Sequence, residues 1–495
     1  MIGRAGLLAM SLLGALVAGV GEAQQPPEPP EVSPEPTGPE PQEPEEALVG
    51  PTAGAPTVGL PEAVSIALEH NFGLLGAVDS VQAARLRESA AKAQFYPKVT
   101  PRYQHSSDNT AFGADLFQKL PWSGASLTAS GTLSSVPQAD SPTARSSDLR
   151  LILTQPLLRG FGPNATNFDL VNSRRGLEGQ ERNLELARQR LAIQVTSSFY
   201  AVVAQRQLLT VSRQSLKRSE SLLRASEARL KIGLVSKLDV FRAQIQASQT
   251  SDSLVRSEAA LQAALEQFRF LLGLAPSHPL EPEGVTLEEM PPDQVEPLEV
   301  LVARGLEKRV DLKEVRDQVR DGERAASLAK QSLLPQLDVS LNVSQLGFGP
   351  SYGDALRTAD TRVSVSVSTA YSLERSAEKV AAAVADLDVI ARQRAVTQKE
   401  MEVETDVRAA VRELDRIRKS VELQRQGVEV AAQQRRLANL RYQRGLASNF
   451  DVVDAEGSLV LARSALVGLL ASYKVALVEL RRATGVLDVA REFAP

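Results

Sequence analysis

The chain contains an internal duplication, and this feature constrains its fold more than any other. Residues 229–243 recur as 441–455, with Gly, Leu, Ser, Asp and Val in register, at an offset of 212 (441 − 229). A second match joins 67–97 to 305–335, at an offset of 238 (335 − 97). The two halves therefore share one structural unit, and the first half carries about 26 extra residues (238 − 212) between Pro97 and its later helices. The duplication predicts a first repeat at 57–290, a second repeat at 291–486 and a C-terminal tail at 487–495.

The N-terminus has the pattern of a secretory signal. Arg4 precedes an apolar run from Ala5 to Val20, and Gly21-Glu22-Ala23 supplies small residues for cleavage, so residues 1–23 are predicted to be a signal peptide. Residues 24–56 are rich in Pro and Glu and contain no Lys or Arg, which predicts a disordered segment. No later stretch was expected to approach the roughly 18 apolar residues of a spanning helix. Any membrane insertion is therefore expected to use strands.

Composition excludes several classes of function. The net charge is −4, too small to attract a phosphate backbone, so nucleic acid is not an expected partner. The chain has no Cys, which removes disulfides and thiolate chemistry. The three histidines, His70, His105 and His278, lie far apart, and no phosphate loop, nucleophile elbow or zinc motif occurs. We expect no enzyme activity, no cofactor and no metal.

Long helices dominate each repeat. Helical segments at 60–96 and 298–334 each end before a Pro, and uninterrupted segments follow at 164–231 and 374–443. A helix of that length spans on the order of 100 Å, which only similar helices can cover. Gly233 and Gly445 predict helix ends, and Ser-x-x-Asp begins the return helices at 236–273 and 448–485.

Strands are predicted between the first two helices of each repeat. Apolar and polar residues alternate in 98–105 and 149–154, and again in 337–344 and 363–368. Two strands per half, in an exported chain, favour strands with lipid on one side and water on the other over a soluble sandwich. Four strands are too few for a conducting barrel, so several subunits must combine. Residues 109–147 contain a further alternating stretch, which is either an extracellular loop or additional barrel strands.

These features together resemble the TolC-type outer-membrane efflux proteins over residues 58–486. The resemblance rests on the duplicated helix-strand-strand-helix-helix unit, on the repeated Gly-Leu-x-Ser-x-x-Asp-Val motif, and on Leu153-Thr154-Gln155-Pro156-Leu157-Leu158-Arg159-Gly160-Phe161-Gly162. It implies a mainly α fold with a trimeric transmembrane β-barrel continued by a long α-helical periplasmic tunnel. It further implies a homotrimer in the lipid of the Gram-negative outer membrane, with a periplasmic adaptor and an inner-membrane pump as partners.

The resemblance also assigns candidate functional residues. It places adaptor docking at the two hairpin turns, namely Gly233, Leu234, Val235, Ser236, Gly445, Leu446, Ala447 and Ser448. It places the acidic constriction of the tunnel entrance at Asp451 and Asp454, which share a helix face at i, i+3. Tyr442 and Asp239 match a link that holds the entrance closed, while Ala447 stands where a basic member of that link is expected.

Two functions remain open at this stage. The preferred one is the outer-membrane channel subunit of a tripartite efflux or type I secretion system. The alternative is a non-conducting exported helical coiled-coil scaffold, which would lack the strands or hold them in a soluble sheet. The sequence does not identify the exported substrate, the pump or the adaptor.

Overall fold

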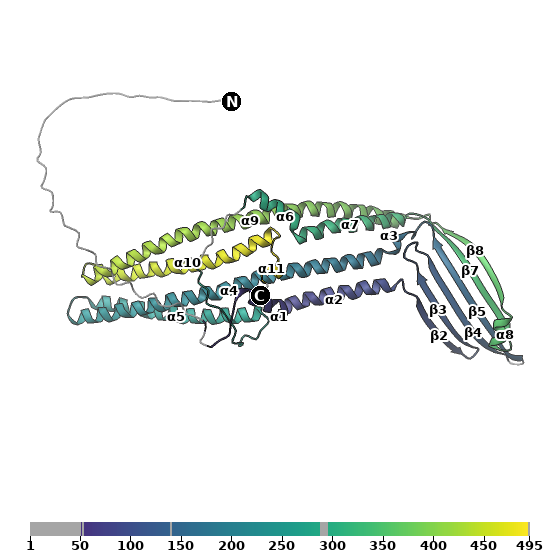
Figure 1. The fold of residues 1–495 in the computed structure, drawn as a ribbon, viewed down its shortest axis with the longest axis horizontal. Helices are drawn as coiled ribbons and strands as arrows, with labels where there is room; N and C mark the ends of the chain where they lie inside the picture. The colour runs from purple at the N-terminus through teal and green to yellow at the C-terminus, as the bar shows by residue number, and fades with distance from the viewer. Residues whose placement is uncertain (1–50, 52–53, 139–140, 288–295, 494–495) are drawn as a thin grey trace, which may run out of the picture. The chain divides into compact units, whose positions relative to one another are not determined.

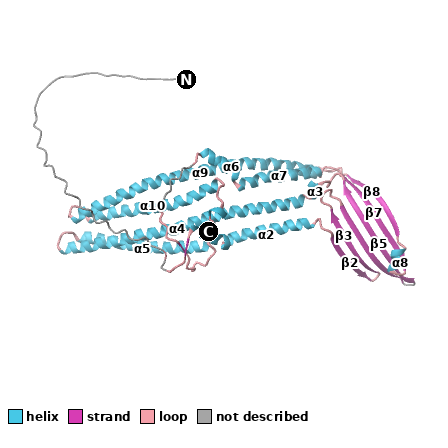
Figure 2. Ribbon diagram, in the orientation of Figure 1, coloured by secondary structure: helices cyan, strands magenta, loops and turns pink. Residues whose placement is uncertain are grey.

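The computed structural model describes residue 51 and residues 54–138, 141–287 and 296–493 (Figure 1). The predicted signal peptide and nearly all of the predicted Pro/Glu-rich segment lie outside the described residues. Every element described below belongs to one compact unit, Leu48–Pro495. The fold is mainly helical, with one large sheet (Figure 2).

The two repeats contribute equivalent sets of helices in the same order. The first repeat has α1 (Leu60–His70), α2 (Phe72–Ala93), α4 (Phe168–Lys231) and α5 (Lys237–Leu271). The second has α6 (Leu298–Lys308), α7 (Val310–Gln331), α9 (Ser376–Gln443) and α10 (Asn449–Ala483). Shorter elements are α3 (Pro163–Thr166), α8 (Tyr352–Arg357), α11 (Val489–Glu492), and the strands β1 (Thr57–Val58) and β6 (Glu281–Pro282), which pair in parallel.

Each helix predicted to open a repeat is in fact two helices, so the predictions at 60–96 and 298–334 were wrong in this respect. The breaks fall at Asn71 and Arg309, which both have extended backbones. The Asn71 side chain accepts a hydrogen bond from the Leu74 backbone amide (3.1 Å), and its side-chain NH2 donates to the Leu271 carbonyl (2.9 Å). The sequence does not reveal such a break, because it depends on a contact 200 residues away.

A close approach of the return helix accompanies the break in both repeats. Gly485 occupies the position equivalent to Gly273, and both glycines have positive φ. A Cβ at Gly273 would lie 2.2 Å from the His70 carbonyl oxygen, and one at Gly485 would lie 3.0 Å from the Arg309 nitrogen. Only glycine therefore lets each return helix end against the broken helix of its own repeat.

The six long strands form a single antiparallel sheet in the order β2-β3-β4-β5-β7-β8 (Figure 1). The strands are β2 (Lys98–Ser106), β3 (Asn109–Lys119), β4 (Ser126–Gln138), β5 (Ser141–Pro156), β7 (Gln336–Gly349) and β8 (Asp360–Ala370). The expectation of two strands per half holds for the second repeat and was wrong for the first, which contributes four. The 109–147 region supplies the additional strands.

The main hydrophobic core lies where the two repeats meet. It includes Phe199 on α4, Phe268 on α5 and Tyr473 on α10, all nearly inaccessible to solvent. The connection between the repeats is fixed by the buried pair of Arg206 and Glu281 (2.6 Å). Leu487 and Phe493, within the region predicted as a C-terminal tail, also pack into this core.

One helix, α10, is long and apolar enough to cross a membrane by length and composition, with a mean hydropathy of 1.5 over its best window. The expectation that no such stretch follows the N-terminus was therefore wrong. In the structure, Leu459, Leu470 and Tyr473 of this helix are buried against its neighbours. Its apolar character is accordingly that of a helix which packs against other helices.

Candidate functional site

One face of the six-stranded sheet is apolar from edge to edge. Because paired residues on antiparallel strands point to the same side, the register defines rows of neighbours across the sheet. One complete row consists of Val99, Leu116, Ala129, Leu151, Val343 and Val363. We call the side that carries this row the apolar face. The short helix α8 covers this face at Ser147, which is buried and donates a hydrogen bond to the Ala355 carbonyl (3.0 Å). Elsewhere its side chains lie open, and Val99 and Val363 are 67% and 66% exposed.

The opposite side of the same sheet, the polar face, carries hydrophilic residues. The adjacent row consists of Thr100, Asp115, Ser130, Arg150, Ser344 and Arg362. Arg102 forms an ion pair with Asp115 on this face, and Arg150 lies 3.1 Å from Asp148. Such a sheet suits lipid on one side and water on the other, which confirms the face pattern predicted from the alternation.

The sheet ends in two unpaired edges, β2 and β8. In the sequence, α2 leads into the edge strand β2, and the edge strand β8 leads into α9. Both α2 and α9 are outer helices of the bundle. One lateral side of the chain is therefore formed by α2 and β2, and the other by α9 and β8 (Figure 1). An unpaired edge exposes a row of hydrogen-bonding groups to any strand that can pair with it.

Ion pairs define the order of the helices near the sheet. Arg174 of α4 reaches Glu88 of α2 (3.4 Å), and Arg182 of α4 reaches Asp317 of α7 (2.6 Å). Lys330 of α7 pairs with Asp386 of α9 (2.8 Å). The order is thus α2-α4-α7-α9.

Polar contacts define the order toward the other end of the long helices. Ser219 of α4 bonds Thr250 of α5 (2.7 Å), and Arg218 of α4 pairs with Glu456 of α10 (2.8 Å). Gln424 of α9 donates to the Ala462 carbonyl of α10 (3.0 Å). The order here is α5-α4-α10-α9. Four helices therefore lie side by side both near the sheet and near the hairpin turns.

Both lateral sides carry exposed apolar residues at helical spacing. On α9 these are Val380, Val384, Leu387, Leu423, Val430 and Leu437. On the other side they are Phe72, Leu75, Val78 and Leu86 of α2 and Phe241, Ile245 and Val255 of α5. Stripes of this kind are typical of helices that pack against further helices.

The two predicted hairpin turns have the same local structure. Gly233 has a φ of 76°, its amide donates to Leu230, and the amide of Leu234 donates to Arg229 (2.9 Å), which is a Schellman motif. Gly445 and Leu446 repeat this pattern with Tyr442 and Arg441. Ser236 then begins α5, where its hydroxyl accepts from the Asp239 amide and the Asp239 carboxylate accepts from the Ser236 amide (3.1 Å).

Apolar side chains project from both turns. Leu234 and Leu446 are 70% and 74% exposed, and Ile232, Leu238, Phe241 and Phe450 beside them are also exposed. We call residues 232–236 and 444–448 the hairpin tips. Water-exposed leucines at equivalent positions of two repeats are the kind of surface that a protein partner covers.

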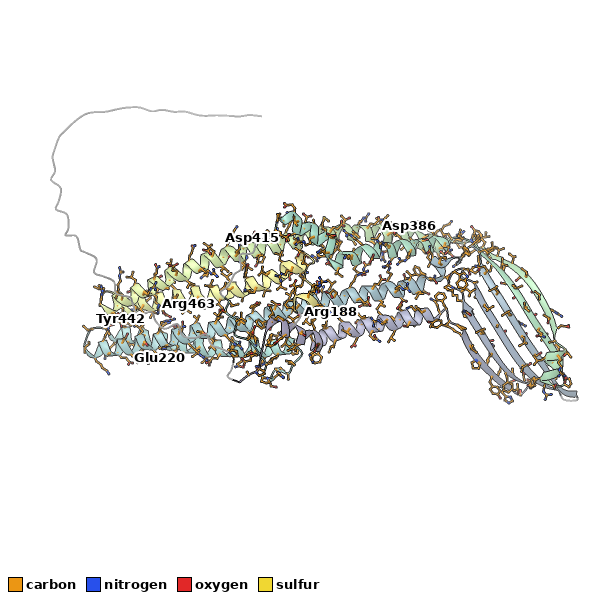
Figure 3. All side chains as sticks on the ribbon, viewed as in Figure 1. Arg188, Glu220, Asp386, Asp415, Tyr442 and Arg463 are labelled. Carbon is orange, nitrogen blue, oxygen red and sulfur yellow. The ribbon has the colours of Figure 1, made fainter. Side chains whose placement is uncertain are left out.

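Tyr442, predicted to lie at the tunnel entrance, is buried between the two long helices. Its hydroxyl lies 2.9 Å from the Ser226 hydroxyl, and Arg229 donates to the Tyr442 carbonyl (2.6 Å). The Arg229 guanidinium also lies over the Tyr442 ring, 4.3 Å from its centroid. Figure 3 labels Tyr442 near the turns of the helical hairpins. We call Tyr442, Arg229 and Ser226 the Tyr442 cluster.

Asp239, predicted to be linked with Tyr442, has different partners within the chain. Its carboxylate accepts from Ser236 and lies 3.8 Å from Arg242, while its carbonyl accepts from Asn449 (2.9 Å). The basic residue that contacts Tyr442 is Arg229 on the other long helix. The sequence analysis missed Arg229 and Ser226, because only their packing against α9 identifies them.

Asp451 and Asp454 are exposed on the first turns of α10. The Asp451 carboxylate accepts hydrogen bonds from the amide (2.7 Å) and the hydroxyl (2.9 Å) of Ser448. These bonds hold the pKa of Asp451 below its ordinary value. Asp451 is therefore charged at neutral pH. Among the described residues, no group of three or more His, Cys, Asp or Glu is arranged to hold a metal ion.

The fold and its surfaces define a class: proteins that place an amphipathic sheet in a lipid bilayer and extend a helical wall from it. Residues 63–274 and 301–486 match the family model described as "Outer membrane efflux protein". The chain therefore belongs to the outer membrane efflux protein family, as its sequence predicted, and it is an outer-membrane channel subunit whose helical part lies in the periplasm.

Known proteins of similar sequence carry related names. The chain is 24% identical over 388 residues to the "Probable efflux pump outer membrane protein TtgC" of Pseudomonas putida, covering 75% of this chain and 76% of that protein. An equal match is the "Antibiotic efflux pump outer membrane protein ArpC" of Pseudomonas putida, with the same coverage.

Solved structures share the fold. The outer membrane protein VceC of Vibrio cholerae superposes with a TM-score of 0.67 at 16% identity, covering 86% of this chain and 96% of that one. The open state of the MtrE outer membrane channel of Neisseria gonorrhoeae gives a TM-score of 0.66 at 16% identity, covering 86% and 89%.

Proposed function

We propose that three copies of the chain join side by side into a closed channel, which serves as the outer-membrane component of a tripartite efflux or type I secretion system. The observation that carries this proposal is the apolar face, which spans all six strands and ends at two unpaired edges. A single copy leaves both edges unpaired and most of the apolar face open, since only α8 covers a part of it, at Ser147. In the assembled channel, lipid covers the face and neighbouring copies pair with the edges.

The proposed contact is head to tail, so that the side formed by α2, α5 and β2 meets the side formed by α9 and β8 of the next copy. The exposed stripe of α9, which includes Val384 and Val430, then packs against the exposed apolar residues of α2 and α5, such as Phe72 and Phe241. A contact between two different surfaces forms a ring when the rotation between copies closes. β2 and β8 run in opposite directions, so each pairing between copies is antiparallel like the rest of the sheet.

The hairpin tips are proposed to dock a periplasmic adaptor protein, which in turn engages an inner-membrane pump. Support comes from the exposed Leu234 and Leu446, which no described part of the chain covers. The positive-φ glycines Gly233 and Gly445 and the caps at Ser236 and Ser448 hold these turns in one conformation. Val235 and Ala447 complete the two four-residue motifs. A rigid turn loses little entropy when a partner binds it.

The tunnel entrance is proposed to lie at the start of α10. In a trimer, Asp451 and Asp454 form rings of carboxylates, which favour the entry of cations. The Tyr442 cluster holds the two long helices of each copy together at this level. Asp239, through its carbonyl bond to Asn449, connects the beginnings of the two return helices. Opening the entrance requires these contacts to loosen.

Transport through the channel is passive on this proposal. The polar face supplies a hydrophilic wall of Ser, Thr, Arg and Asp side chains, which lets hydrated solutes or unfolded proteins pass without a dedicated binding pocket. The name of one relative, ArpC, mentions antibiotic efflux, and antibiotics are candidate cargo here too. On this proposal, the inner-membrane pump supplies the energy for transport and selects the exported compounds.

Fractionation and planar-bilayer recording of the full-length chain test the proposal. We expect the protein in the outer-membrane fraction, a slowly migrating species in sodium dodecyl sulfate gels that heating converts to monomer, and discrete conductance steps. A trimer that inserts but never conducts supports the alternative, a non-conducting scaffold. A soluble monomer contradicts both membrane insertion and ring closure.

A further inference from the structure

The duplication shows which strands of the sheet are additional. In the second repeat, only the strands β7 and β8 lie between α7 and α9. In the first repeat, four strands lie between the equivalent helices α2 and α4. Applying the upstream offset of 238, β7 corresponds to residues 98–111, where β2 lies. Applying the downstream offset of 212, β8 corresponds to residues 148–158, the second half of β5. The extra residues of the first repeat therefore form β3 and β4.

This inserted hairpin is a full part of the sheet. β3 and β4 have 11 and 13 residues, enough for a strand that spans a bilayer. Leu116 and Ala129 belong to the apolar face, while Asp115 and Ser130 belong to the polar face, in register with their neighbours on both sides. This alternation is expected of a strand with lipid on one side and water on the other, and it is not expected of a loop outside the membrane.

The turn of the inserted hairpin is anchored where the sheet joins the helices. Ser123 accepts at its carbonyl from the Gln155 amide group (3.0 Å) and from the Gly162 amide (3.4 Å). Gly124 has a φ of 79°, and a Cβ there would lie 2.6 Å from the Gly160 carbonyl oxygen. The turn thus occupies the same level as the strand-to-helix connections of both repeats.

The single tryptophan of the chain lies in this turn. Trp122 is 67% exposed, and the other connections at this end of the sheet carry the exposed aromatics Tyr96, Phe161 and Tyr371. Aromatic residues gather at the boundary between lipid and water. Trp122 therefore places the inserted hairpin in the same belt as the strands that the duplication predicts.

From these observations we propose that the inserted hairpin spans the membrane and enlarges the barrel, so that each copy supplies six strands and three copies close an eighteen-stranded barrel. The proposal rests on the trimer proposed above and adds the strand number and the width of the pore.

A comparison of perimeters supports six strands per copy. Eighteen strands about 4.8 Å apart and tilted by about 40° have a perimeter of roughly 110 Å, against roughly 75 Å for twelve. Three copies with four helices side by side, about 8–10 Å apart, have a perimeter of roughly 95–120 Å. The wider barrel therefore meets the helical wall without a constriction at the junction. A barrel of this strand number encloses an aqueous lumen of porin size.

Tryptophan fluorescence in lipids with brominated acyl chains tests the proposal on the assembled trimer. In a Trp122→Phe background, Leu116→Trp places the probe on the apolar face of β3, and Phe117→Trp places it on the polar face one residue later. We expect acyl-chain bromine to quench Leu116→Trp strongly and to leave Phe117→Trp nearly unquenched. If neither probe is quenched, the hairpin lies outside the bilayer and the proposal is overturned.

Three further variants separate failure of the eighteen-stranded barrel from failure of membrane insertion or of assembly. Val365→Trp reports on β8, which belongs to the barrel whether or not the hairpin does. Quenching at Val365→Trp without quenching at Leu116→Trp overturns the eighteen-stranded barrel alone, whereas no quenching at either position contradicts membrane insertion itself. If Leu116→Trp fails to assemble, Ala129→Trp and Thr128→Trp provide the same comparison on β4.

Discussion

The guanidinium of Arg229 lies 4.3 Å from the centroid of the Tyr442 ring and donates to the Tyr442 carbonyl, which joins the ends of the two longest helices. The two residues come from different repeats, so the contact ties the first hairpin tip to the second. The Ser226 hydroxyl completes the Tyr442 cluster at 2.9 Å from the phenol oxygen. This contact fixes the spacing of the helices at the proposed entrance.

Weakening the Tyr442 cluster is expected to open the entrance. Tyr442→Phe removes one hydrogen bond worth about 1 kcal/mol, which raises the ratio of open to closed channels by roughly fivefold. Arg229→Ala removes the backbone bonds and the contact with the ring, and has a larger effect. Single-channel recordings measure both.

The matched control for Arg229→Ala is Arg224→Ala. Arg224 is an exposed residue of the same helix that contacts only its own helix, at Glu220 and Ser221. The Arg224→Ala substitution should leave the fraction of open channels unchanged. Equal behaviour of the two arginine variants would show that the Tyr442 cluster does not control the entrance.

Neutralising the acidic residues at the start of α10 is expected to reduce cation selectivity. Asp454→Asn and Asp451→Asn each remove three charges from the trimer, so the reversal potential in a KCl gradient shifts toward zero. Asp415→Asn, far from the tips on α9 (Figure 3), serves as the control. An unshifted reversal potential in the double variant places the selectivity elsewhere.

The pH dependence of this selectivity follows from the bonds to Asp451. Hydrogen bonds from Ser448 lower the pKa of this carboxylate, so it keeps its charge to a lower pH than an ordinary aspartate does. In an Asp454→Asn channel, the remaining selectivity should therefore be lost at a lower pH than an ordinary aspartate would give. Ser448→Ala removes the hydroxyl donor, and the loss should then begin at a higher pH.

The ring of copies is expected to depend on the exposed stripe of α9. Val430→Asp places a carboxylate where the neighbour's apolar surface is proposed to pack, which should reduce the heat-sensitive trimer by about tenfold or more. Val430→Leu keeps the surface apolar and should retain the trimer. A normal trimer in Val430→Asp would exclude this face from the contact between copies.

Acid sensitivity is expected at the break between α6 and α7. Burial raises the pKa of Asp311, but hydrogen bonds and charge from Arg309 (2.6 Å) and Lys399 (3.1 Å) outweigh it and lower that pKa to about 2. A lowered folded-state pKa contributes stability above the unfolded pKa, and this is lost as the pH falls from about 4 to about 2. The contribution is on the order of 2 kcal/mol.

Thermal unfolding of Asp311→Asn measures this contribution. The variant should melt below the wild type at neutral pH, and the difference should shrink progressively below about pH 4. Asp386→Asn, an exposed partner of Lys330 at 2.8 Å, should cost much less, since surface ion pairs contribute little. A constant difference between wild type and Asp311→Asn across this range would contradict the linkage.

The features that depend on local pattern could be predicted from the sequence. The tips follow from Gly233 and Gly445 with their Ser-x-x-Asp caps, and the two faces of the sheet follow from strict alternation in segments such as 363–368. The family followed from the tip motif together with the duplicated unit and residues 153–162, and the family match confirms it. The tips and the alternation are signals that lie within about ten neighbouring residues, and the duplication is visible because it repeats such local patterns.

The features that depend on distant contacts could not be predicted. The break at Asn71 needs Leu271, and the role of Arg229 needs Tyr442 on the other repeat. The sequence does not distinguish a loop from strands at β3 and β4, because Gly113 and Gly131 interrupt the alternation and small residues weaken it. Register with β2 and β5, which only the fold supplies, identifies them as strands.

Electron cryo-microscopy of the full-length protein, extracted from outer membranes into lipid nanodiscs, tests the central claim most directly. The account predicts a ring of three copies in which β8 of each copy pairs with β2 of its neighbour and α9 packs against the neighbour's α2 and α5. A particle in which β2 and β8 of the same copy pair with each other, or in which the copies meet through other surfaces, would contradict it.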